Sequence, residues 1–198
     1  KLPNVDHDKL FFVIWTTTIW TLPGNLGICL HPEETYVLAK APNGEIYILA
    51  EALTEKVMKI GGFDEYEIIE KHPGSFFENM LADHPFLPKT SRLLNAEYVT
   101  MESGTGCVHT APGFGADDYE TCRRYGMDMV VPVDDRGRHT EYAGKYAGLK
   151  TDESNPIILE DMKQSGMLFA SEDITHSYPH CWRCKGPIIF RATPQWFC

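Results

Sequence analysis

The N-terminal part of the sequence contains the stretch LFFVIWTTTIWTLPGN, residues 10–25. Its first six residues are apolar, aromatic or β-branched, a pattern that predicts a short buried strand over residues 10–15. Three consecutive threonines follow directly, so the hydroxyl and N–H groups of residues 16–18 are expected at the end of that strand. Such groups are able to hold a carbonyl, a ribose or a water molecule. Threonine also favours strands for structural reasons alone, so both interpretations stand at this point.

Similar short strand-like runs recur along the rest of the chain. They are predicted at residues 26–30, 36–40, 46–49, 66–70, 98–101, 107–110 and 129–133. Helices are predicted over residues 51–60, from Asp117 as the start of a capping box, and from the N-cap Asn155 with Pro156 behind it. The Pro- and Gly-rich segment 72–88 is assigned no strand. Many short strands with few helices predict a mixed α/β, mainly β fold with a compact β-barrel core and peripheral helices.

The composition excludes several classes of protein. The chain of 198 residues has the size of about one domain. Its 12% of aromatic residues excludes intrinsic disorder. The longest apolar run, residues 10–15, is far shorter than the roughly 20 residues that cross a membrane. With 18 Lys plus Arg against 28 Asp plus Glu, the formal charge of −10 disfavours a generic nucleic-acid binder, although a local basic site remains open.

The two ends of the sequence and its cysteines indicate what kind of protein the chain comes from and in which compartment it is found. It begins KLPNVDHD, without Met or an export signal, and it stops in QWFC, so we expect a fragment of a longer protein. Six cysteines are too few for a disulfide scaffold. Since no export signal is present, we expect a reducing, cytoplasmic location.

A second stretch, GTGCVHTAPGFGADD, covers residues 104–118. Its glycines allow a backbone to approach a ligand closely, and a glycine-rich loop before a helix usually indicates anion binding. Two carboxylates at the helix start argue against a phosphate and favour a cation, either an ammonium group or a metal ion. We assign a capping role to Asp117, whereas for Asp118 a cap and a ligand-binding role both remain open. A metal site made by Asp117, Asp118 and His109 is a further alternative.

A third stretch, HSYPHCWRC, covers residues 176–184 and contains a C-x-x-C pair. Cys181 and Cys184 have the spacing of two zinc ligands, and a closed structural site needs four. His176 and His180 are local candidates for the missing pair, and a pair outside this chain is the other. Two unligated thiols are the structural alternative.

Together, these segments resemble the editing domain of isoleucyl-tRNA synthetase, an insertion in a class I aminoacyl-tRNA synthetase. Residues 15–25 match its threonine-rich peptide, and residues 104–112 with Gly115 and Asp118 match its second signature. Ile19 departs from the Pro that is usual in the family. Residues 1–175 would be the editing domain, and residues 176–198 a return segment toward the synthetic domain.

The resemblance implies hydrolysis of valyl-tRNA(Ile), that is, tRNA(Ile) wrongly charged with valine. This family is itself the standard example of why a second selection step is needed, because one methylene group gives only ~1–3 kcal/mol of discrimination. A pocket that admits valine and rejects isoleucine by size removes the wrong product. The alternative is a non-catalytic module that guides the tRNA acceptor end or docks against the rest of a synthetase.

The resemblance also implies roles for individual residues. Asp118 would bind the α-ammonium group of the esterified valine, and the three threonines Thr16, Thr17 and Thr18 would position the attacking water. His109 would form a wall of the side-chain pocket and reach toward the ester. Further candidates for substrate binding are Trp20, Asn25 and Gly106. No general base is evident, so catalysis would rest on the positioning of water and ester, helped by the free hydroxyl of the terminal ribose.

The same resemblance makes Cys181 and Cys184 half of a structural zinc site whose other pair lies outside this chain. Editing itself would need no cofactor. The expected partners are the 3′ end of tRNA(Ile) carrying valine and the rest of the synthetase chain. No membrane partner and a monomeric fragment are expected.

Overall fold

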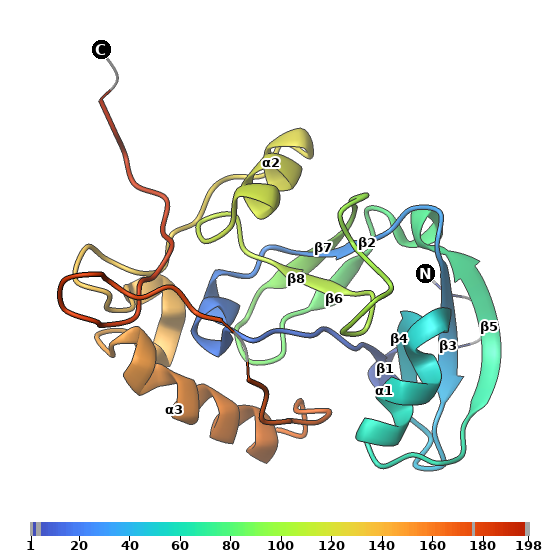
Figure 1. Ribbon diagram of the computed structural model, residues 1–198. Helices are drawn as coiled ribbons and strands as arrows, with labels where there is room; N and C mark the ends of the chain where they lie inside the picture. Colours follow the sequence, from blue (N-terminus) through green and yellow to red (C-terminus); the bar gives the residue numbers. More distant parts are fainter. Residues whose placement is uncertain (1, 3–4, 176, 197–198) are drawn as a thin grey trace.

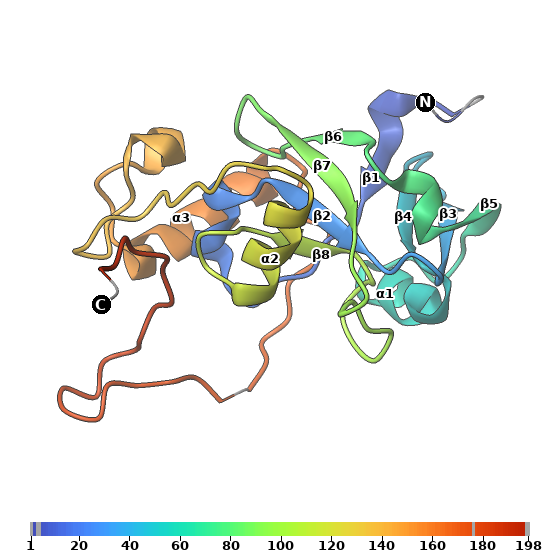
Figure 2. The same cartoon turned by 90° about the horizontal axis from the view of Figure 1, so that it is seen from above.

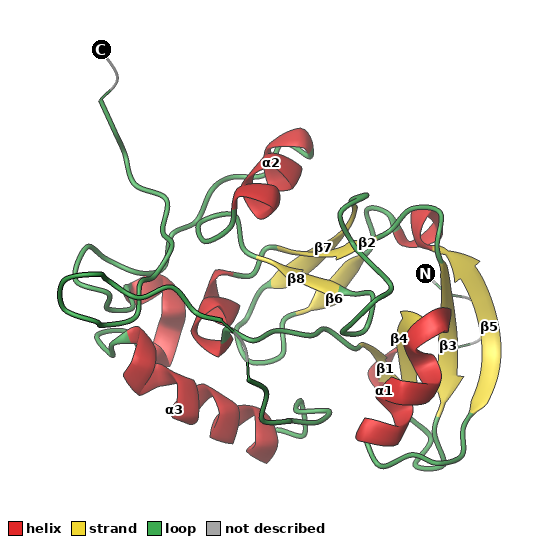
Figure 3. Ribbon diagram, viewed as in Figure 1, coloured by secondary structure: helices red, strands yellow, loops and turns green. Residues whose placement is uncertain are grey.

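The computed structural model describes residue 2, residues 5–175 and residues 177–196. Two four-stranded sheets form its centre, and helices surround them (Figures 1 and 3). One sheet lies at one end of the molecule with helix α1, the other sheet is in the middle, and α3 lies at the opposite end (Figures 1 and 2). In the described part of the chain, no helix has the length and apolar character needed to span a membrane.

The first sheet has the strand order β1-β4-β3-β5. Its strands are β1 (Leu10–Phe12), β3 (Thr35–Lys40), β4 (Ile46–Ala50) and β5 (Glu67–Pro73). β3 and β4 form a hairpin around the turn at residues 41–45, and β1 pairs in parallel with β4. All residues of β4 are buried, because α1 (Thr54–Ile60) and a cluster shared with the second sheet cover this sheet.

The second sheet has the order β6-β7-β2-β8. Its strands are β2 (Gly27–Leu30), β6 (Leu81–Asp83), β7 (Thr90–Asn95) and β8 (Val108–Thr110). β2 lies between β7, with which it is parallel, and β8, with which it is antiparallel. Leu30 and Leu93 from this sheet pack in the same apolar cluster as β3 and β4, so the two sheets share one core.

The helices complete the architecture. α2 (Ala116–Arg124) follows β8, and α3 (Thr151–Gln164) packs against the 3₁₀ helix η2 (Ile19–Gly24). The other short 3₁₀ helices are η1 (His7–Lys9), η3 (Glu51–Leu53), η4 (Gly74–Phe77) and η5 (Glu141–Tyr146).

The predicted mixed, mainly β fold is confirmed, although the barrel description is loose. The described strands form two open sheets, because the edge strands β1 and β5 of one sheet do not pair with the edge strands β6 and β8 of the other. Among the described residues, a single bridge between Trp15 and Val108 connects the two sheets. The predicted strand at residues 98–101 is wrong. Tyr98 and Val99 lie in a loop that packs on an apolar cluster with Cys29 and Cys122. At residues 129–133 only an isolated bridge from Val133 is present.

The two helices predicted from Asp117 and Asn155 are present, but neither residue is the N-cap. α2 begins one residue before Asp117, with Gly115 as its N-cap, so Asp117 lies inside the first turn. α3 begins at Thr151 rather than after Asn155, because the Glu153 carboxylate accepts a hydrogen bond from the Lys150 N–H at 3.0 Å and closes the first turn earlier. Pro156 therefore lies within the helix.

Candidate functional site

The threonine peptide, defined as Thr16, Thr17 and Thr18, leaves strand β1 alongside β8. The Trp15 N–H donates to the Cys107 carbonyl at 3.4 Å, and Trp15 forms a bridge with Val108. The Thr16 hydroxyl accepts from the Thr18 N–H at 3.0 Å, which tightens the turn that leads into η2. Thr17 is exposed, and the other two threonines are half-buried. The peptide thus presents hydroxyl groups at the surface beside β8.

His109 lies in the middle of β8, and its ring is buried against the segment that follows the threonine peptide. Its Nε2 is 3.0 Å from the Thr21 hydroxyl and its Nδ1 is 2.6 Å from the Asn25 amide nitrogen. Burial, with smaller contributions from the nearby His84 and Lys89, lowers the pKa of His109 to about 3. The ring is therefore neutral at physiological pH, and both of its nitrogens are engaged within the protein.

A shell of polar groups from β7 and the preceding loop supports this contact. The Ser91 hydroxyl donates to the Asn25 side-chain oxygen at 2.6 Å. The Lys89 ammonium donates to the carbonyls of Pro23 and Asn25, each at 2.7 Å, and burial lowers its pKa to about 8. His84 contacts the Leu22 carbonyl at 3.0 Å, and burial lowers its pKa to about 4. The C-terminal end of η2 is therefore held by side chains from a distant part of the sequence.

Asp118 lies in the first turn of α2, directly after the glycine-rich loop. Its carboxylate accepts a hydrogen bond from the Ala111 N–H at 2.8 Å, and Ala111 is the residue that follows β8. Burial raises the pKa of the Asp118 carboxyl group, and the neighbouring Asp117 raises it further, while the Ala111 contact lowers it. A cation that approached this half-buried carboxyl group would favour its charged form.

The structure thus places the threonine peptide and Asp118 at the same strand. Trp15, the residue before the peptide, contacts Cys107 and Val108 at the start of β8, and Asp118 contacts Ala111 just beyond its end. No hydrogen bond joins Asp118 to the threonine peptide, both of which lie in the described part of the chain.

Two predicted site residues have evident structural roles. Trp20 is buried in η2 and packs edge-to-face on Phe114, with ring centroids 4.9 Å apart. Gly106 has φ +76°, and a Cβ there would lie 2.4 Å from the Cβ of Ala50. Its carbonyl accepts from the Tyr36 hydroxyl at 2.6 Å. A side chain at Gly106 is therefore excluded by the packing of the core.

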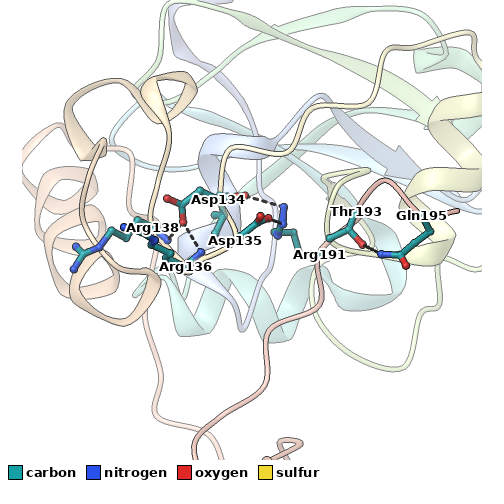
Figure 4. A network of polar contacts seen from close by, with 8 residues as sticks. Asp134, Asp135, Arg136, Arg138, Arg191, Thr193 and Gln195 are labelled. Atoms are coloured by element: carbon teal, nitrogen blue, oxygen red, sulfur yellow. Dashed lines mark hydrogen bonds and ion pairs between the residues drawn. The ribbon is translucent and has the colours of Figure 1, made fainter.

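The described part of the return segment, residues 177–196, is mostly loop and contacts the rest of the chain at residues 191–192. The Ala192 N–H donates to the Gly113 carbonyl at 2.8 Å, and Arg191 pairs with Asp135 (Figure 4). These contacts place residues 191–192 beside the loop that joins β8 to α2.

Cys181 and Cys184 lie in a tight turn of the return segment. The Cys181 N–H donates to the Gly186 carbonyl at 2.8 Å, and the Lys185 N–H donates to the Cys181 carbonyl at 2.9 Å. The backbone N–H groups of Cys184 and Arg183 point at the Cys181 thiol and lower its pKa. The turn therefore fits two ligands of a tetrahedral zinc site. Within the described residues no group of three or more His, Cys, Asp or Glu side chains is arranged to hold a metal ion, and His176 lies outside those residues.

A surface hollow of about 530 Å³ lies beside α2. It is lined by residues that include Asp117, Glu120, Arg123 and Arg124. Neither Asp118 nor the threonine peptide lines it. It is therefore separate from the candidate site.

Four residues of the site were missed from the sequence, namely Thr21, His84, Lys89 and Ser91. Thr21 lies within residues 15–25, the threonine-rich signature, so its position in that motif could have identified it. The other three fall in or beside a segment without strand or motif character, so nothing local distinguished them.

The comparisons with known proteins agree with this architecture. The sequence matches a family described as "Leucyl-tRNA synthetase, editing domain" over residues 4–176. Two curated relatives are the "Isoleucine--tRNA ligase" of Fervidobacterium pennivorans, 51% identical, and that of Kosmotoga olearia, 54% identical, each over 197 residues. Each match covers 100% of this chain and 21% of the relative, so the chain spans about one fifth of the relatives' length.

Solved structures show the same fold. The crystal structure of GlLeuRS-CP1 matches with a TM-score of 0.64 and 19% identity, covering 83% of this chain and 84% of that chain. The editing domain of the P. falciparum cytosolic leucyl-tRNA synthetase matches with a TM-score of 0.59 and 13% identity, covering 78% of this chain and 77% of that one.

Proposed function

The chain belongs to the leucyl-tRNA synthetase editing-domain family, and from this premise we propose that it hydrolyses valyl-tRNA(Ile) as one domain of an isoleucyl-tRNA synthetase. The ester bond between valine and the terminal ribose is the reacting bond. Water adds to the ester carbonyl, the bond from the carbonyl carbon to the ribose oxygen breaks, and the ribose oxygen takes a proton. The products are free valine and uncharged tRNA(Ile).

The observation that carries this proposal is the position of Asp118. Its half-buried carboxylate is fixed by the Ala111 N–H at the end of β8, the strand that Trp15, directly before the threonine peptide, bridges at Val108. An aminoacyl ester differs from most esters by its α-ammonium group, and an ionised carboxylate in a partly dehydrated position is suited to bind it. Asp118 would orient the substrate so that its ester faces Thr16, Thr17 and Thr18.

The remaining residues would position the water and the substrate, and none of them would transfer a proton. The exposed hydroxyl of Thr17 and the half-buried hydroxyl of Thr18, 3.3 Å apart, would hold the attacking water or the ribose. His109 is neutral and has both nitrogens engaged, so we assign it to the wall of the pocket rather than to the ester. An activated ester with oriented water needs little further help, and the free ribose hydroxyl is available to assist.

For the two thiols we propose a structural role. Cys181 and Cys184 would hold one zinc ion together with two ligands supplied by the rest of the synthetase. Zinc would fix the geometry of the return segment and take no part in hydrolysis.

The test uses a synthetase that carries this chain, incubated with valyl-tRNA(Ile). Asp118→Ala removes the charged contact, and we expect deacylation to fall roughly ten- to a hundredfold, the value of a hydrogen-bonded charge. Asp117→Ala is the matched control, because Asp117 is an exposed carboxylate in the same helical turn and its loss should change the rate less than about twofold.

Undiminished deacylation by the Asp118→Ala enzyme would overturn the assignment of Asp118. If the unaltered enzyme left valyl-tRNA(Ile) intact, the deacylase function itself would be wrong, and the domain would be a module that guides the acceptor end or docks against the synthetase.

A further inference from the structure

Four buried or nearly buried side chains from three segments meet beside the threonine peptide. They are connected in one sequence of contacts, which we call the positioning chain: Ser91, Asn25, His109 and Thr21. Its last member, Thr21, donates its hydroxyl proton to the Thr18 carbonyl at 2.7 Å. The positioning chain of hydrogen bonds therefore ends at the threonine peptide.

The direction of every hydrogen bond in the positioning chain is fixed by a backbone carbonyl group that accepts at each of its two ends. The Gly27 carbonyl accepts from the Asn25 side-chain nitrogen at 2.9 Å, and a carbonyl has no proton to give, so the NH₂ group of Asn25 must face that way. The second N–H of the same group then points at His109 Nδ1, 2.6 Å away, which must accept. The Asn25 oxygen, in turn, accepts from the Ser91 hydroxyl.

The other end gives the same answer independently. The Thr18 carbonyl is also an acceptor, so the Thr21 hydroxyl uses its one proton there. That leaves the Thr21 oxygen to accept from His109 Nε2, 3.0 Å away. Both ends therefore require the His109 proton to be on Nε2 and none to be on Nδ1.

We propose that the positioning chain holds the Thr18 carbonyl, and with it the threonine peptide, in place through His109 fixed as the neutral tautomer protonated at Nε2. Ser91 and Thr21 are then positioning residues for the reaction, a role that rests on the proposed deacylase function. His84 and Lys89 are the other titratable groups near this ring, and both lie beside the carbonyls of η2.

The tautomer is tested directly by ¹⁵N NMR of the His109 ring in the 198-residue chain, without reference to activity. We expect a protonated Nε2 and a bare Nδ1. Asn25→Asp replaces the donor at Nδ1 by an acceptor of the same shape, so we expect Nδ1 to become protonated. A bare Nε2 in the unaltered chain overturns the proposal even if every variant fails to fold.

The positioning role is tested by deacylation in the synthetase. Thr21→Val removes the hydroxyl at nearly constant volume, and we expect kcat to fall roughly tenfold with KM little changed, while Thr21→Ser restores the rate. Ser91→Ala should lower kcat several-fold. Its matched control is Ser154→Ala, because Ser154 is also a buried serine whose hydroxyl contacts a histidine, His139, at 2.8 Å, and this pair is not part of the positioning chain.

Two outcomes separate the proposals. A Thr21→Val enzyme with unchanged kcat, or equal losses for Ser91→Ala and Ser154→Ala, overturns the positioning role. If the unaltered enzyme leaves valyl-tRNA(Ile) intact while the NMR result is as expected, the deacylase function fails and the hydrogen-bond directions stand.

Discussion

The surroundings of β8 and the return segment both contain side chains suited to chemistry, but they differ in what completes them. Around β8, the polar groups of Thr21, Asn25, Ser91 and His109 are paired with one another or with backbone carbonyls. In the return segment, Cys181 and Cys184 lie in an exposed turn that, by our proposal, would supply two of the four ligands of a zinc site. A site whose partners all come from one fold is rigid, whereas a half-site depends on the protein around it. Four predictions test this difference.

The largest expected effect distinguishes the sheet core from the return segment. Phe77 is fully buried and contacts the rings of Phe12 and Tyr36, so Phe77→Ala should lower the free energy of unfolding by about 3–5 kcal/mol. Phe190→Ala is the matched control, because Phe190 is 65% exposed and its loss should cost less than about 0.5 kcal/mol. Denaturant unfolding of the 198-residue chain measures both. Comparable decreases in the free energy of unfolding for the two variants would show that the return segment packs as firmly as the core.

The next effect compares two glycines. Gly106→Ala would strain a left-handed backbone and overlap with Ala50, which should cost about 2–4 kcal/mol. At Gly186 in the cysteine turn, an added Cβ meets the Cys184 sulfur at an ordinary 3.5 Å, so Gly186→Ala should change stability by less than about 0.5 kcal/mol. The same unfolding experiment decides. A harmless Gly106→Ala would mean that the loop before β8 is free to move.

A smaller effect concerns acid. His109 and His84 have pKa values lowered to about 3 and about 4 by burial. Between these values and 6.5 the unfolded chain binds more protons than the folded chain, so stability falls as the pH falls. The slope should be about 1.4 kcal/mol per pH unit for each histidine. Unfolding from pH 7 to pH 5 measures it, and His109→Gln should remove the share of one histidine. An unchanged slope in that variant would contradict the burial of the ring.

The smallest effect is expected from metal. If Cys181 and Cys184 are two ligands of four, as proposed, the 198-residue chain should hold zinc weakly or not at all. Adding zinc or a chelator should therefore leave the unfolding midpoint within about one degree. Metal analysis that finds one tightly held zinc per chain would contradict this and favour a local site that includes His176 or His180.

The local part of the fold was predictable from sequence, and the long-range part was not. The β3–β4 hairpin is evident because its strands are apolar and joined by a short turn. One local pairing is an exception: the β6–β7 hairpin was missed because β6 has only three residues and β7 begins with the polar residues Thr90, Ser91 and Arg92. The pairing of β7 with β2 is long-range. Residues 98–101 have the composition of a strand, but Val99 packs on Cys29 and Cys122 without pairing.

The candidate site divides in the same way. The threonine peptide and Asp118 stand in recognisable patterns, so sequence alone located them. The link from Ser91 through Asn25 to His109 joins three segments, and only the folded sheet brings them together. The roles of these residues in hydrolysis remain predictions for the experiments described above.

The position of β2 has a consequence for how the protein folds during its synthesis on the ribosome. Both of its neighbours, β7 and β8, lie later in the chain, the nearer one about sixty residues on. During translation, β2 must therefore wait with both edges unpaired while the first sheet is already able to form its hairpin. Nascent chains in which residues 90–110 have not yet left the ribosome should be recognised by chaperones through this strand, and those in which these residues have emerged should not.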